Sequence, residues 1–130
     1  MTVALVLLLG PHALAKPAAA PALTLEGRVT ATTRPAPHCG TGAFAIKVRF
    51  QVEEVVEGDY KQPSVDVIVG CPEMFPIRLV VGARAQLVLA REAPRPKVSW
   101  AFMGELPAPR FPEFWLVRAT QRDGGPSKPR

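Results

Sequence analysis

Every second residue from 44 to 52 is a large apolar one, with polar side chains between them from Lys47 onward, and this alternation constrains the fold more than any other feature. A period of two is typical of a β-strand with one buried face and one face in water. The alternation slips at Glu53-Glu54, which predicts a β-bulge, and stops at the turn residues 57–59. The apolar positions are Phe44, Ile46, Val48, Phe50 and Val52, with Lys47, Arg49 and Gln51 between them.

Further strands are expected wherever similar patterns lie between groups of proline, because proline cannot donate to a sheet ladder. Gly27 within the first strand predicts a bend, and residues 72–76 are the best place for a single helical turn. Residues 77–81 form an expected short extra strand, and 100–103 an edge strand or a loop plug. The strands are predicted at residues 23–32, 43–56, 64–71, 83–90 and 114–119.

Five bent strands in about 100 residues, with Pro-rich loops and little helix, favour a small all-β Greek-key barrel of the OB-like type. A seven-stranded immunoglobulin-like sandwich is the alternative, but it needs more strands than the pattern supplies.

The N-terminus predicts export. Residues 1–15 combine a short apolar run with Ala13-Leu14-Ala15, a cleavage pattern of signal peptides. A strand or helix buried in the domain is the alternative, and no basic residue opens the run. Residues 16–22 are then a flexible linker, 23–121 the barrel and 122–130 a disordered tail. We expect a periplasmic or secreted protein without a membrane span.

The formal net charge of +5 raises the possibility of a nucleic-acid partner. The basic residues are scattered along the chain rather than clustered. An Arg-rich proteome produces the same balance, so we predict no nucleic-acid binding.

The two cysteines predict a disulfide, because an even pair in an exported chain is typically oxidised. Cys39 precedes the long strand and Cys71 ends the next one, and an antiparallel hairpin brings those two ends together. Closing a loop of about 33 residues stabilises a fold by roughly 3–4 kcal/mol in the chain-entropy model. The alternative is a copper site made by His38, Cys39, Cys71 and Met74.

The order of strands resembles the barrel of tissue-inhibitor-of-metalloproteinase and netrin modules, and of small exported bacterial proteins that share it. The resemblance rests on residues 25–30, on 52–59 with its Gly-Asp turn, and on Val81-Gly82 before residues 85–90. It implies a barrel used for binding. The inhibitors of this family chelate zinc through an N-terminal cysteine, whereas the expected mature chain here begins at Lys16, so protease inhibition is not implied.

Catalytic groups are sparse. His38 could be combined with Ser64 or Ser99, but no nucleophile-elbow pattern is present. The carboxylates of Glu53, Glu54 and Glu57 fit a solvated face better than an acid–base pair. We therefore predict a non-enzymatic protein without a cofactor.

The leading hypothesis is an exported binding or interaction domain whose partner is another envelope or extracellular protein. Three or more exposed rings in one patch would favour its expected binding surface, whereas buried rings would simply close the barrel end. An alternative is oligosaccharide or oligonucleotide binding on the barrel face, where Lys47, Arg49 and Gln51 offer charge but no ring for stacking. The expected binding surface comprises Trp100, Phe102, Arg110, Phe111 and Trp115.

Overall fold

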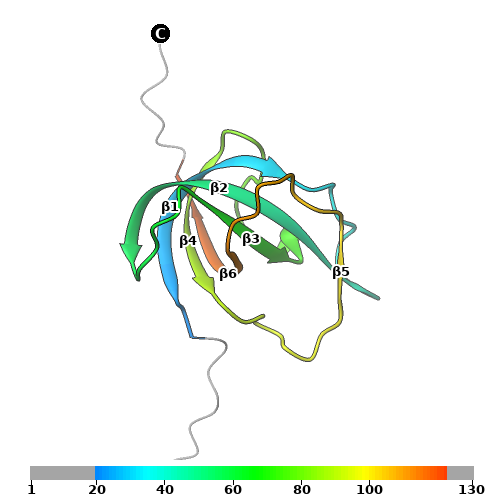
Figure 1. Ribbon diagram of the computed structural model, residues 1–130. Coiled ribbons are helices and arrows are strands. Elements are labelled where there is room, and N and C mark those ends of the chain that lie inside the picture. Colours follow the sequence, from blue (N-terminus) through cyan, green and yellow to red (C-terminus); the bar gives the residue numbers. More distant parts are fainter. Residues whose placement is uncertain (1–19, 123–130) are drawn as a thin grey trace, which may run out of the picture.

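A computed structural model describes residues 20–122, so the predicted signal peptide and most of the predicted tail lie outside the described residues. The described chain is all-β apart from one short 3₁₀ turn, as predicted (Figure 1). No helix of this part of the chain is long and apolar enough to cross a membrane. The elements are β1 (Leu23–Thr32), β2 (Ala43–Glu57), β3 (Ser64–Gly70), η1 (Pro72–Met74), β4 (Arg84–Ala90), β5 (Trp100–Phe102) and β6 (Glu113–Gln121).

Five of the strands close into a barrel in the order β1-β4-β6-β3-β2, and β2 pairs with β1 again to complete the circle. All of these pairs are antiparallel except β3 with β6. Closure removes free sheet edges, which would otherwise invite pairing with other chains. The OB-like barrel predicted from the sequence is thus confirmed, with β5 as a sixth strand that pairs in parallel with the start of β2.

The barrel bends where the sequence predicts irregularity. Glu26 pairs with Glu54 and the next residue of β1, Gly27, pairs with Val52, which leaves Glu53 without a partner as the bulged residue. A Cβ atom on Gly27 would lie 2.9 Å from the carbonyl oxygen of Gln51. The two strands therefore cross more closely here than a side chain would permit.

The core fills the inside of the barrel with the inward rows of all five strands. Burying each large apolar side chain stabilises the fold by about 1.5–3 kcal/mol. The inward-facing rows of apolar side chains are therefore the main source of stability of the barrel. Residues 77–81, expected as a short strand, instead form an irregular segment. The fully buried side chains include Leu25, Val29, Val48, Phe50, Val65, Val67, Val69, Leu87, Leu89 and Leu116.

Residues 91–112, which we call the strap, connect β4 to β6 and run over the outside of the barrel. Figure 1 shows this yellow-to-orange connection passing beside β2 as β5 and then returning across β2 to β6. The Met103 N–H donates to the Ala45 carbonyl at 3.1 Å, and the Arg34 N–H donates to the Met103 carbonyl at 3.2 Å. The prediction that this face of β2 is in water is therefore wrong around Lys47 and Arg49, because the strap covers both side chains.

Candidate functional site

The polar side of β2 is the first place where the sequence suggested binding, and the structure pairs its cations internally. Arg49 is 7% exposed and Asp66, on β3, is 4% exposed. Arg49 Nε lies 2.7 Å from Asp66 Oδ1, and Arg49 Nη2 lies 3.1 Å from Oδ2. The hydrogen bond to Asp66 raises the pKa of Arg49 although burial opposes this. Phe111 covers the pair, with its ring centroid 4.9 Å from Arg49 Cζ.

Both carboxylate oxygens of Asp66 accept hydrogen bonds from other residues of the protein. Its Oδ2 also accepts the backbone N–H of Phe111 at 3.3 Å. Oδ1 accepts Arg49 Nε, and Oδ2 accepts both Arg49 Nη2 and the Phe111 N–H, so the Asp66 carboxylate binds the strap as well as β2.

Lys47 is paired in the same way. Its Nζ lies 3.1 Å from a Glu105 carboxylate oxygen and 2.9 Å from one of Glu113, and 5.3 Å from the centroid of the Phe102 ring. Burial lowers the pKa of Lys47, but the hydrogen bonds and charges of Glu113 and Glu105 outweigh it and raise the pKa overall. The charge expected on the barrel face is thus matched by the chain's own carboxylates.

The aromatic residues of the predicted binding surface pack the strap against the barrel. The rings of Trp100 and Trp115 lie 5.5 Å apart between centroids, and those of Phe102 and Trp115 lie 6.4 Å apart. Phe102, at 43%, is the large ring that stays well exposed, whereas Trp100, Trp115 and Phe111 are half-buried. The exposed Arg110 lines a small polar hollow beside Phe111. Binding by these residues stays a prediction.

The carboxylate cluster at the bulge is tied to neighbouring cations. Glu53 accepts Arg84 Nε at 2.8 Å and lies 3.9 Å from Arg28 Nη2, while Glu54 and Glu57 are exposed. Such surface pairs contribute about 0–1 kcal/mol each. The arrangement is that of a solvated face.

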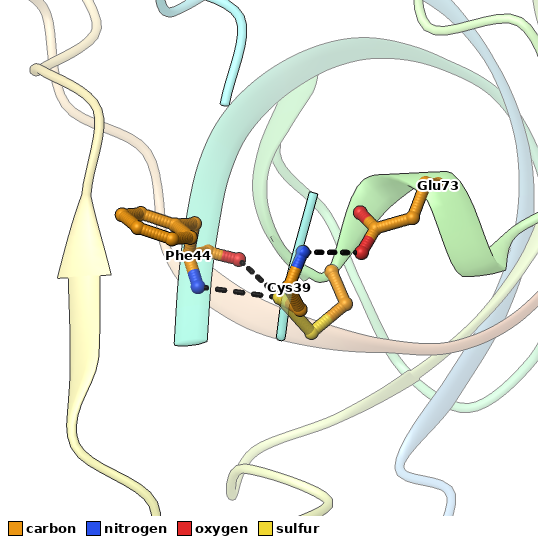
Figure 2. The surroundings of a disulfide bond; sticks show 4 residues. Cys39, Phe44 and Glu73 are labelled. Carbon is orange, nitrogen blue, oxygen red and sulfur yellow. Dashed lines mark hydrogen bonds between the residues drawn. A yellow bond between two sulfur atoms is a disulfide. The ribbon is translucent and has the colours of Figure 1, made fainter. Parts of the chain in front are cut away.

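The predicted disulfide between Cys39 and Cys71 is present, with the two Cα atoms 5.5 Å apart. Figure 2 shows its surroundings: Glu73 of η1 accepts the Cys39 N–H at 2.7 Å, and the Phe44 N–H donates to Cys39 Sγ at 3.3 Å. A structural disulfide is typical of proteins in an oxidising compartment. It joins the β1–β2 loop, residues 33–42, to the β3–β4 segment, residues 71–83.

The oxidised pair does not supply the thiolates that the copper hypothesis requires. The other two residues of that ligand set are at the surface, with Met74 70% exposed and His38 exposed. Glu73, rather than His38, lies beside the two sulfur atoms.

The disulfide stands beside a hollow of about 510 Å³, which we call the groove, between the β1–β2 loop and the β3–β4 segment. Val80 and Val81 on one wall are 50% and 66% exposed. Polar side chains share the lining on both sides. The lining includes Thr33, Ala36, His38 and Ile46 from the β1–β2 side and Glu73, Ile77, Leu79, Val80 and Val81 from the other.

The sequence did not predict the groove as a site. Its one signal was the segment 77–81, apolar except for Arg78, which was predicted as a short extra strand. No protein-family model, curated protein or solved structure matches the chain.

Proposed function

We propose that this protein is an exported, non-catalytic binding domain that holds an apolar segment of another envelope or extracellular protein in the groove. The observation that carries the proposal is the exposure of two consecutive valines, Val80 and Val81, at the edge of the groove. Adjacent exposed apolar side chains beside a hollow are typical of interaction sites. The volume of about 510 Å³ lies within the range of ligand-binding clefts.

The groove is preorganised, which supports binding because an ordered site loses less entropy when it is filled. One wall begins at Cys71 and the other contains Cys39, so the disulfide fixes their separation. The hydrogen bond from the Cys39 N–H to Glu73 adds a second link between the walls. Thr33, His38 and Glu73 provide polar groups for the backbone of a bound segment.

The covered barrel face favours the groove over the alternatives. OB-type barrels bind oligosaccharides and oligonucleotides on the face of strands 2 and 3. In this chain the strap covers that face, and Lys47 and Arg49 are paired with carboxylates. The resemblance to the netrin-type module, in which the barrel serves binding, agrees with a protein partner.

Photo-crosslinking from the groove tests this function. A photo-reactive amino acid in place of His38, which is exposed on the wall opposite Val80 and Val81, should give one stoichiometric adduct with a protein from the organism's own envelope fraction. The double variant Val80→Ser/Val81→Ser should lose most of this adduct. The matched control is Val56→Ser, which removes a valine that is 45% exposed near the other end of β2.

The control should leave the adduct unchanged. An adduct of equal yield in the double variant, or none in the parent protein, would refute a recognition role for the groove. Urea unfolding of all three variants checks that the barrel is intact.

A further inference from the structure

A second, smaller pocket lies beside the disulfide, between η1 and the strap. Its volume is about 140 Å³. An engineered cavity of about 150 Å³ in another protein binds benzene, so this pocket has room for one aromatic ring or one branched aliphatic group. Its walls are mainly apolar and aromatic, and they include Met74, Phe75, Pro94, Trp100 and Trp115.

Two polar side chains that line this pocket, Arg95 and Trp100, carry hydrogen-bond donors. Arg95 lines it, is exposed, and has no ion-pair partner among residues 20–122. The indole Nε1–H of Trp100, another lining residue, is buried and has no acceptor within the described chain. None of the residues that line the pocket carries a carboxylate. An anionic or acceptor group on a ligand is therefore the missing complement.

We propose that the pocket binds a small apolar carboxylate, independently of the groove. The ring or branched group would contact Trp100 and Trp115, and the carboxylate would pair with the Arg95 guanidinium. Arginine suits this role because its planar fork binds a carboxylate through two parallel hydrogen bonds. The free carboxylate of a peptide that ends in an apolar residue has the same chemistry.

Tryptophan fluorescence reports on this pocket directly, because Trp100 and Trp115 are the two tryptophans of the chain. We expect phenylacetate to produce a saturable change in emission. Benzyl alcohol, which keeps the ring but lacks the charge, should bind roughly tenfold more weakly, since hydrogen bonds to charged groups are the stronger ones.

The variant Arg95→Gln should bind phenylacetate as weakly as the parent binds benzyl alcohol. Lys97→Gln is the matched control, because it removes an exposed cation two residues away that does not line the pocket. Arg95 is exposed, so the variant should fold normally, and urea unfolding verifies this.

A short peptide ending in phenylalanine, with a free or an amidated C-terminus, separates the two sources of such a ligand. Tighter binding of the free-acid peptide than of phenylacetate assigns a peptide terminus, and binding of phenylacetate alone assigns a free small acid. Equal affinity for phenylacetate and benzyl alcohol, or no saturable change with any of the probes, would overturn the proposal.

Discussion

At the scale of single residues, the buried ion pair of Arg49 and Asp66 should affect the free energy of unfolding more than any other charged pair described above. Both side chains are at least nine-tenths buried, so removing one leaves a desolvated charge without a partner. We expect Arg49→Met to lower the free energy of unfolding by about 3–5 kcal/mol, whereas Arg49→Met/Asp66→Leu should recover most of it. Urea unfolding of the single and double variants measures this.

The matched control is Arg84→Gln, which breaks a partly exposed pair with Glu53 and should cost about 1 kcal/mol or less. Equal losses for Arg49→Met and Arg84→Gln would show that the strap does not keep water from the Arg49 pair.

Tyr60 gives the fold a pH dependence at its alkaline end. Its hydroxyl donates to the Ser64 carbonyl, and its ring lies 6.0 Å from that of Phe114. Burial and the negative charge of Asp66 raise the pKa of Tyr60 from 10.0 to about 12. The folded state thus holds this proton more tightly than the unfolded state does. The resulting stability is intact below pH 10.0 and is lost as the pH rises through about 12.

Because the chain has a single tyrosine, tyrosinate absorbance reports this group alone. We expect a midpoint near 12 in the folded protein and near 10.0 in urea. Tyr60→Phe should reduce the loss of stability across that window. A folded-state midpoint near 10.0 would mean that water reaches the hydroxyl.

At the scale of elements, local pattern predicts the strands, including the edge strand within residues 100–103, but it does not predict the path of the strap across β2. The alternation in β2 and the slip at Glu53 are visible in neighbouring residues, and both appear in the barrel at the expected positions. The strap depends on contacts between residues far apart in sequence, such as Trp100 with Gly70 and Phe111 with Arg49. A polar residue such as Arg49 therefore looks solvent-facing until the strap is in place.

One part of the candidate site, the disulfide, could be predicted from local sequence, and the other part, the groove, could not. The disulfide could be predicted because both cysteines flank strands whose antiparallel pairing brings the ends together. The groove could not, since it forms where residues 33–38 and 72–81, two segments outside the strands, lie opposite each other. No periodicity describes either segment.

The packing of the strap residue Trp100 on Gly70 of β3 leads to a prediction at the scale of elements. A Cβ atom on Gly70 would lie 2.5 Å from Cη2 of Trp100, so the indole packs directly on the backbone of β3. We expect Gly70→Ala to displace Trp100, to lower the free energy of unfolding by about 1–3 kcal/mol and to shift tryptophan emission to the red. Gly40→Ala is the control, because a Cβ there meets no atom within 4 Å. Unchanged emission in Gly70→Ala would refute this packing.

At the scale of the whole molecule, the barrel and the groove depend on the disulfide differently. The core residues lie on strands that close on themselves, whereas the groove walls are loops joined through Cys39 and Cys71. The sequence separation of 32 residues corresponds to a stabilisation of about 3–4 kcal/mol. Removal of the bond should therefore leave a folded but weaker barrel, because small domains have about 5–15 kcal/mol in total.

The double variant Cys39→Ala/Cys71→Ala tests this, with unfolding in urea as the measurement. Cys71 has a φ of 51°, a left-handed conformation that costs a non-glycine residue roughly 1–2 kcal/mol. Cys39→Ala/Cys71→Gly should consequently be more stable than the double-alanine variant by up to about 1 kcal/mol, since glycine relieves that strain.

Crosslinking from position 38 should fall in both variants, because neither has the covalent bond that joins the two groove walls. A fall in crosslinking alongside a cooperative unfolding transition would assign the disulfide to the groove as well as to the fold. Undiminished crosslinking would mean that the hydrogen bond between Cys39 and Glu73, or the packing of the loops, is sufficient to hold the groove open.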